Sequence, residues 1–199
     1  MSTTEYKPEN FLVLQVDVSS HTEWLGKDVT DNTKWFKKHN ARKELGKQII
    51  KILKKYDFNR YLWNGDGGIF FCKEEDKGNY DFVVNAGDEL YNLFEKWKGD
   101  NKDLDAQPLG LRVSADLELI IAEDSPSFWT SYNLNRFVKD EKTITIRGFA
   151  ISQTIKNNLT KFKDRFGDQQ LVDRFNNVNF FIDSIHRYDK IVKSKCHQD

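Results

Sequence analysis

The stretch FNRYLWNGDGGIFFC, residues 58–72, contains two runs of aromatic and aliphatic residues separated by Asn64-Gly65-Asp66-Gly67-Gly68. Asparagine and glycine between two such runs are typical of a β-hairpin, because these residues tolerate the positive φ angles of tight hairpin turns. We therefore predict two neighbouring strands, over residues 58–63 and 69–72, with Asp66 in the turn between them.

The segments around this hairpin complete a recognisable order of elements. A β-branched apolar run at 11–18 predicts a buried strand, and apolar residues spaced by three, four and seven over 31–56 predict an amphipathic helix capped by Asp31 or Thr33. A second helix is expected at about 80–97 and a strand at 109–121, whose core face would carry Leu111, Val113, Leu117 and Leu119. The resulting order, βαββαβ, is that of a ferredoxin-like fold with an antiparallel sheet and two helices on one face.

Further elements are expected after residue 121. They are a charged connection containing Trp129, a short strand at 142–146, a helix from Gly148 to about 162, a helical stretch near 168–175 and a strand at 178–183. No internal repeat and no linker rich in glycine, proline or serine divides the chain. We predict a single α+β domain over residues 1–199: a palm-type antiparallel sheet with added C-terminal strands and helices.

Composition narrows the class of protein. The 31 basic and 31 acidic residues give a formal net charge of zero, which argues against non-specific attraction to nucleic acid. Residues 1–10 are polar and no apolar run is long enough for a membrane span, so a cytoplasmic protein without membrane partners is expected. Cys72 and Cys196 are too few for a disulfide framework or a thiolate cluster, so any metal would be held by oxygen.

Asp17 and Asp66 stand out because each interrupts an apolar strand pattern. In the predicted topology the first strand and the hairpin lie in the middle of the sheet, so the two carboxylates can converge at one edge. Carboxylates suit Mg²⁺, and two such ions can assist phosphoryl transfer. The alternative is that Asp17 caps a loop and Asp66 is an ordinary turn residue.

Three segments, in this order, resemble the catalytic domains of class III nucleotidyl cyclases. They are FLVLQVDVSSHTEWL at 11–25, LWNGDGGIFF at 62–71 and RGFAISQTIKNNL at 147–159. The resemblance spans about residues 10–162 and leaves about 163–199 as a C-terminal extension. It implies the class III nucleotidyl cyclase fold and synthesis of a cyclic nucleotide with release of pyrophosphate.

The resemblance also implies roles for individual residues. Two Mg²⁺ or Mn²⁺ ions per site would be held by Asp17, Asp66 and the main-chain carbonyl of Val18. The triphosphate would be cradled by the loop after the first strand, formed by Ser19, Ser20, His21 and Thr22. His21 could instead be a solvated loop residue. Ser152 and Lys156 occupy the positions of the family's catalytic Asn and Arg, and Lys156 keeps a positive charge there without the planar fork of arginine.

Residues at the base-binding positions depart from the purine cyclases. Leu62 and Thr145 stand where those enzymes carry Lys and Asp, and Asn64 lies nearby in the hairpin. These departures indicate either an inactive relative or a different base. The chain resembles most the pyrimidine cyclases of bacterial Pycsar antiphage systems, which implies conversion of UTP or CTP into cyclic UMP or cyclic CMP for antiviral defence. UTP is the first choice because Thr145 and Asn64 can serve the uracil carbonyls.

Members of this family act as head-to-tail homodimers with interfacial sites, so the metal acids of one chain would face Ser152 and Lys156 of the other. Trp129, Tyr132 and Phe137 would serve that interface or the core. Three alternatives stay open: a diguanylate cyclase, although the turn lacks that family's second acid; a catalytically silent nucleotide-binding sensor or scaffold of the same fold; and a docking role for the basic-aromatic tail at 185–195, against a merely solvated tail.

Overall fold

A computed structural model describes residues 7–27, 30–74, 78–122, 148–167, 170–172 and 179–187. The helices are α1 (His21–Gly26), α2 (Asn32–Lys55), α3 (Asp81–Asp100) and α5 (Gln153–Asn157), with short 3₁₀ turns at Lys102–Leu104 and Lys163–Arg165. The strands are β1 (Pro8–Ser19), β2 (Arg60–Asn64), β3 (Gly67–Lys73), β4 (Gly110–Ile121), β5 (Gly148–Ser152), β6 (Gln170–Val172) and β7 (Asn179–Arg187).

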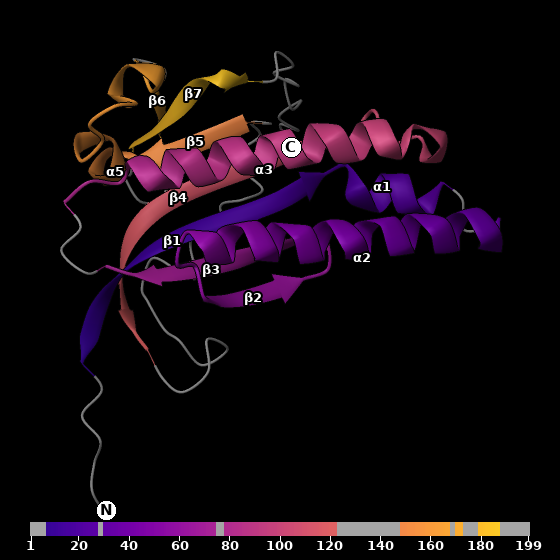
Figure 1. The fold of residues 1–199 in the computed structure, drawn as a ribbon, viewed down its shortest axis with the longest axis horizontal. Coiled ribbons are helices and arrows are strands. Elements are labelled where there is room, and N and C mark those ends of the chain that lie inside the picture. The colour runs from indigo at the N-terminus through magenta and orange to yellow at the C-terminus, as the bar shows by residue number, and fades with distance from the viewer. Residues whose placement is uncertain are drawn as a thin grey trace, which may run out of the picture.

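The strands form one sheet in the order β2-β3-β1-β4-β5-β7-β6. Its first four strands are antiparallel, and α2 and α3 lie across one face of them (Figure 1). This arrangement confirms the predicted ferredoxin-like core with added C-terminal strands. The β4–β5 pair is parallel, because the chain returns to the sheet in the same direction, so the complete sheet is mixed.

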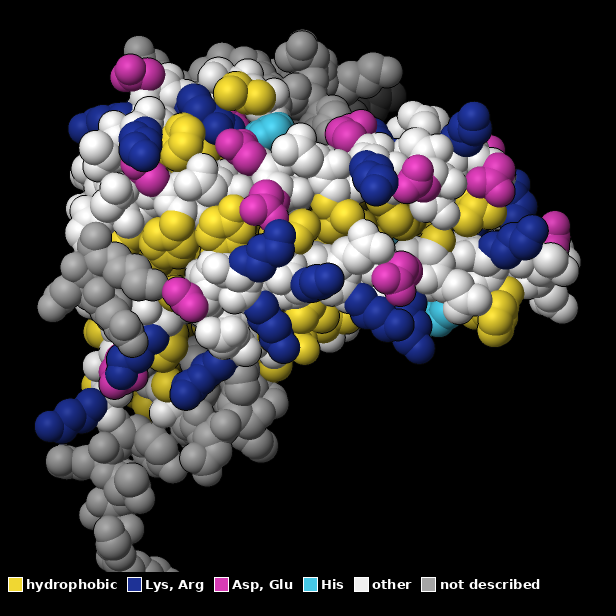
Figure 2. Space-filling view, viewed as in Figure 1, with side chains coloured by type: hydrophobic (Ala, Val, Ile, Leu, Met, Phe, Trp, Pro, Cys, Tyr) yellow, Lys and Arg dark blue, Asp and Glu magenta, His cyan; other side chains and the backbone are white. Residues whose placement is uncertain are grey.

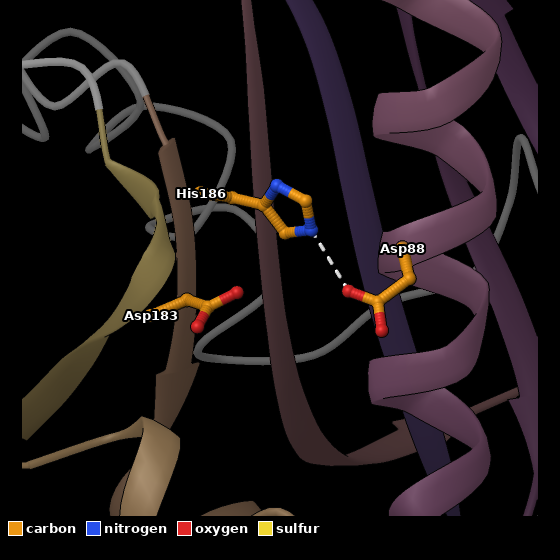
Figure 3. A group of neighbouring side chains, drawn as sticks. All are labelled: Asp88, Asp183 and His186. Atoms are coloured by element: carbon orange, nitrogen blue, oxygen red, sulfur yellow. Dashed lines mark hydrogen bonds and ion pairs between the residues drawn. The ribbon is translucent and has the colours of Figure 1, made fainter.

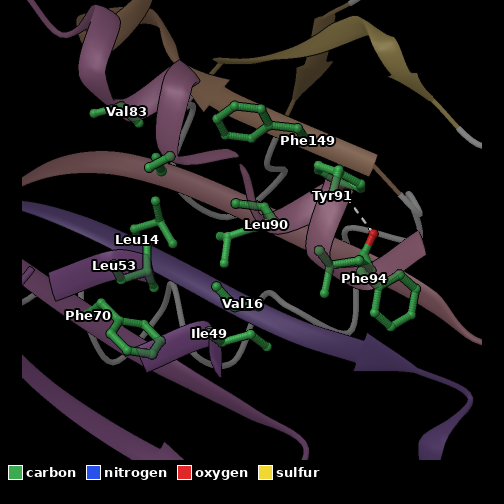
Figure 4. Packing of buried hydrophobic residues seen from close by; sticks show 14 of the residues in the cluster. Leu14, Val16, Ile49, Leu53, Phe70, Val83, Leu90, Tyr91, Phe94 and Phe149 are labelled. Atoms are coloured by element: carbon green, nitrogen blue, oxygen red, sulfur yellow. Dashed lines mark hydrogen bonds between the residues drawn. The ribbon is translucent and has the colours of Figure 1, made fainter. Parts of the chain in front are cut away.

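Alternation along β1 sends apolar residues to both faces of the sheet. Leu14 and Val16 point to the helix side and pack with residues of α2 and α3 such as Ile49 and Leu90 (Figure 4). The opposite face, which we call the open face, carries a second cluster made of Phe11, Val13, Phe71, Ile120, Ala150 and Phe180. The open face also carries Asp17, so the candidate site lies on the side of the sheet away from α2 and α3.

Local signals placed several elements correctly. The Asp31 side chain accepts hydrogen bonds from the main-chain N–H groups of Thr33 and Lys34, both at 3.0 Å, and caps α2 as predicted. The predicted hairpin is present as β2 and β3.

Over α2 and α3, Figure 2 shows basic and acidic side chains interspersed rather than separated. Within the described ranges, no helix combines the length and apolar character needed to cross a membrane.

Other predictions were wrong. The helix expected from Gly148 begins only at Gln153, because Phe149 and Ile151 alternate with Ala150 in β5 and are buried against the helices. Residues 170–172 form a strand within the segment expected to be helical near 168–175. Leu119 was expected in the core and is 58% exposed. The strand predicted at 142–146, together with Trp129, Tyr132, Phe137 and Cys196, lies outside the described residues.

Candidate functional site

Asp17 lies near the end of β1, between two strands. In the sheet register it stands opposite Gly67 on β3 and opposite Arg112 on β4. Its carboxylate is almost buried, and Arg112 is its cationic partner: Nε donates to Oδ2 at 2.7 Å, and Nη2 contacts the same oxygen. A buried carboxylate on the open face is therefore paired with a cross-strand guanidinium.

The turn that carries Asp66 is fastened to the end of β1. The Val18 N–H donates to the main-chain carbonyl of Asp66 at 3.1 Å, and the Asp66 N–H donates to the Asn64 carbonyl at 2.9 Å. The Asp66 side chain is 37% exposed, so it remains accessible to solvent. The structure thus brings the main chain of the turn acid to the residue after Asp17, while the convergence of the two carboxylates on one metal stays a prediction.

Gly67 allows this close approach. A Cβ atom at Gly67 would lie 2.4 Å from the Val16 carbonyl oxygen and 3.1 Å from the Asp17 Cα. Both neighbours are backbone atoms that cannot rotate away, so any side chain at position 67 would push β3 away from β1. The glycine after Asp66 is therefore required by the geometry of the two acids.

His21 is part of α1 and is buried, so the alternative of a solvated loop residue is wrong. Its Nδ1 lies 3.4 Å from Asp66 Oδ2, and its buried Nε2 has no hydrogen-bond partner in the described part of the chain. Burial lowers the pKa of His21, and the nearby Asp66 carboxylate only partly opposes this shift. The imidazole is consequently neutral near pH 7.

The other residues of the predicted phosphate loop differ in their surroundings. The Ser19 hydroxyl donates to the Gly110 carbonyl at 3.2 Å and is thereby committed within the chain. Ser20 adopts a left-handed backbone, with φ 63°, and its carbonyl accepts from the Trp24 N–H to begin α1. Thr22 is exposed. The chain therefore turns sharply at Ser20, directly after the Asp17 strand.

Two of the three predicted base-binding residues, Leu62 and Asn64, lie in the described part of the chain. Leu62 is half-buried at the edge of the open-face cluster, and Asn64 is exposed at the end of β2, opposite Gly67. Both alternate onto the same sheet face as Asp17. Thr145 lies outside the described residues.

Ser152 and Lys156 are engaged by their own chain. Ser152 is 1% exposed; its hydroxyl accepts from the Ile155 N–H and also hydrogen-bonds to the Asp116 side chain. Lys156 Nζ donates to the Gly167 carbonyl at 3.3 Å and lies 3.8 Å from the centre of the Phe181 ring. These two side chains stand on and beside α5, across β4 from Asp17.

Three charged residues on the open face were not predicted from the sequence. Arg112, Asp116 and Glu118 all lie on β4, and the two acids are buried and share a hydrogen bond. Burial raises the pKa of Asp116, and the hydrogen bond from Ser152 only partly offsets this. The signal was present in the sequence, since polar residues at 112, 114, 116 and 118 alternate with apolar ones along β4.

A separate group of possible metal ligands lies on the helix side of the sheet. Ligand atoms of Asp88, Asp183 and His186 lie within 4.8 Å of one another (Figure 3). Arg165 already pairs with both acids of this group, because its guanidinium donates to both Asp88 oxygens at 2.8 Å and to Asp183. Burial would raise the pKa of Asp88, but hydrogen bonds from Arg165 and His186 outweigh it and hold that pKa below its usual range. This group is an ion-pair and hydrogen-bond network around Arg165 rather than the site predicted around Asp17.

The donor set around Asp17 suits a divalent cation. It offers two carboxylates from adjacent backbone segments and the main-chain carbonyl of Val18, whereas the described cysteine, Cys72, pairs with Leu12 further along β3. Hard oxygen ligands of this kind fit Mg²⁺ or Mn²⁺. One of these carboxylates, Asp17, is paired with Arg112 in this structure.

Comparisons with known proteins place the fold. No family model and no curated protein matches the chain. The guanylyl cyclase Cya2 matches with a TM-score of 0.65 and 13% identity over 93% of this chain and 96% of its own. The adenylyl cyclase CyaB from P. aeruginosa matches at 0.59 and 13%, over 92% and 96%, and adenylate cyclases from Trypanosoma brucei at 0.64 and 11%, over 94% and 95%.

The chain has the fold of a nucleotidyl cyclase catalytic domain. The fold class predicted from sequence is thereby confirmed. At these low identities the likeness concerns the backbone arrangement, so the roles of individual residues rest on the geometry described above.

Proposed function

We propose that this protein is a nucleotidyl cyclase that converts a pyrimidine nucleoside triphosphate into its 3′,5′-cyclic nucleotide and pyrophosphate. One observation carries the proposal: in a cyclase fold, the Val18–Asp66 main-chain hydrogen bond fastens the turn acid beside the buried strand acid, Asp17. In this proposal the two carboxylates and the Val18 carbonyl hold two Mg²⁺ or Mn²⁺ ions.

The reaction joins the substrate's 3′-oxygen to its α-phosphorus. The bond from that phosphorus to the bridging oxygen breaks, pyrophosphate leaves, and the 3′-hydroxyl proton passes to solvent. Divalent ions, when bound, lower the pKa of the attacking hydroxyl and neutralise charge on the triphosphate. The chain's own task is positioning: Asp17 and Asp66 fix the ions, and the sharp turn from Ser19 to Thr22 orients the triphosphate beside them.

The proposed enzyme is a homodimer in which Ser152 and Lys156 of one chain face the metal acids of the other. Lys156 must then leave Gly167 and Phe181 to reach a nucleotide. The guanylyl cyclase domain of RhoGC from Blastocladiella emersonii has been solved both as a non-canonical dimer, with a TM-score of 0.60 to this chain, and as a monomer, with 0.54. Dimerisation therefore needs its own test in this protein.

The proposed substrate is UTP, ahead of CTP. Leu62 presents no charge to a base, and Asn64 and Thr145 supply neutral donors and acceptors that suit a single-ring base. A purine would leave exocyclic groups unpaired, at a cost of about 1–3 kcal/mol each. The cyclic pyrimidine nucleotide would serve as a second messenger in antiphage defence.

A specific observation favours a second candidate, a catalytically silent nucleotide sensor. Ser152 and Lys156, the proposed catalytic pair, are both committed to contacts within the chain. Calorimetry separates the two functions, because nucleotide binding without pyrophosphate release identifies the sensor.

The test is a competition assay with all four nucleoside triphosphates at equal concentration and Mn²⁺, followed by mass identification of the products. We expect cyclic UMP to dominate; a dominant cyclic CMP would overturn only the choice of uracil, whereas cyclic AMP or cyclic GMP would overturn the pyrimidine assignment. Asp17→Asn should abolish the product. Asp103→Asn, at an exposed acid in the 3₁₀ turn after α3, is the matched control and should leave turnover unchanged.

A further inference from the structure

The contact between Arg112 and Asp17 has a specific geometry. Two N–H groups of one guanidinium, Nε and Nη2, both point to a single carboxylate oxygen, Oδ2. The two residues are direct cross-strand partners, on β4 and β1. The Asp17 side chain is 9% exposed and that of Arg112 is 26% exposed, so the pair is largely withdrawn from water.

A carboxylate oxygen offers two lone-pair positions. The two N–H groups of Arg112 belong to one guanidinium, so they converge on Oδ2 from the same side. An ion that coordinates the same oxygen would lie close to the guanidinium, repel it, and compete with these hydrogen bonds for Oδ2. Guanidinium and divalent cation are thus alternatives at Oδ2 rather than additive partners.

Charge balance leads to the same conclusion. A carboxylate as buried as Asp17 needs a neighbouring positive charge, since an unpaired buried charge is strongly destabilising. Arg112 meets that need when no metal is bound, and a bound metal would meet it without Arg112. Retaining both against one oxygen would place like charges side by side in a partly desolvated site.

We propose that Arg112 is a built-in counter-ion that competes with the divalent cation for Oδ2 of Asp17. Metal entry therefore requires the guanidinium to leave, and the protein's affinity for metal in the absence of nucleotide is set by this exchange. The inference rests on the proposed function, because it takes Asp17 as a metal ligand. It adds a role for Arg112 that weakens metal binding and stabilises the metal-free fold.

A simple field effect must be separated from direct competition, because removing any nearby cation strengthens metal binding somewhat. Two variants make this separation. Arg112→Lys keeps the positive charge but loses the planar fork of the guanidinium. Direct competition therefore predicts tighter metal binding in this variant, whereas a field effect predicts no change in metal affinity. Arg42→Gln removes a different cation beside the turn, whose Nη1 lies 3.8 Å from where a Gly65 Cβ would be.

The experiment titrates each purified variant with Mn²⁺ alone and follows the free ion by electron paramagnetic resonance. We expect Arg112→Met to bind Mn²⁺ about tenfold more tightly than wild type, Arg112→Lys to lie between them, and Arg42→Gln to change affinity less than either. Equal affinities for wild type and both Arg112 variants, or an equal gain in Arg42→Gln and Arg112→Met, would overturn the competition.

A measurement on the wild-type chain keeps the proposal testable if the variants do not fold. The ¹⁵N resonance of Arg112 Nε should shift towards that of solvated arginines as Mg²⁺ saturates the site. Mg²⁺ binding that depends on Asp17 but leaves this resonance in place would refute the competition and spare the proposed function. Absence of Asp17-dependent binding, judged with Asp17→Asn, would refute both.

Discussion

Substitution of Gly67 by alanine tests how the two acids are brought together. The added Cβ would lie 2.4 Å from the Val16 carbonyl oxygen. An ordinary carbon–oxygen contact is at least about 3.3 Å, so the strands must separate by about 0.9 Å. Because the opposing atoms belong to the backbone, no side-chain rotation relieves the clash, and we expect a loss of about 1–3 kcal/mol in the free energy of unfolding.

The same displacement should reach the metal site. Asp66 directly precedes Gly67, and the Asp66 carbonyl accepts a hydrogen bond from the Val18 N–H. A wider gap between β1 and β3 therefore moves Asp66 away from Asp17. Urea unfolding gives the stability change, and Mn²⁺ titration gives the metal affinity, which should weaken. The matched control is Gly99→Ala on α3, where a Cβ meets nothing within 4 Å; it should stabilise the helix by about 0.5–1 kcal/mol.

A Gly67→Ala protein within about 0.5 kcal/mol of wild type, with unchanged Mn²⁺ affinity, would refute this reasoning. Loss of stability without loss of metal affinity would show that the turn acid does not depend on the β1–β3 distance.

Three further predictions address the charge networks and the dimer. Arg165→Met should destabilise the protein by about 3–5 kcal/mol in urea unfolding, because it leaves the fully buried Asp183 and its neighbour Asp88 without their cation; a change below about 1 kcal/mol would contradict this. The pKa of Asp116 is raised in the folded protein, so protonated Asp116 contributes to the free energy of unfolding. This contribution is fully present below the unfolded-state pKa, about 3.9, and is lost as pH rises through the folded-state pKa. The unfolding free energy of Asp116→Asn should therefore decline less than that of wild type as pH rises from about 4 to 8, and parallel profiles would count against the assignment. Mixing inactive Asp66→Ala and Lys156→Ala chains should restore part of the activity if sites form between chains, and no recovery despite proven subunit exchange would place each site within one chain.

Local patterns were sufficient for the first half of the fold. The glycine-rich turn predicted the hairpin, and the Asp31 cap predicted the start of α2, because both depend on residues close in sequence. The nearness of the hairpin turn to the end of β1 followed once the strand order was inferred, since neighbouring strands share an edge of the sheet.

Long-range contacts explain what the sequence did not predict. Arg112 and Asp17 are separated by 95 positions, and nothing near either residue indicates the other. Phe149 and Ile151 are compatible with helical and extended spacing, and only pairing with β4 decides for a strand. The commitment of Lys156 to Gly167 and Phe181 likewise depends on where β7 and the 3₁₀ turn pack.

The proposed catalysis of an internal phosphoryl transfer can be followed by ³¹P nuclear magnetic resonance of a single reaction. The purified protein is incubated with UTP and Mg²⁺ while all phosphorus species are followed over time. We expect equal amounts of pyrophosphate and a cyclic phosphodiester, with neither formed by Asp17→Asn. Release of orthophosphate alone, or an unchanged UTP spectrum under conditions in which the nucleotide is bound, would contradict it.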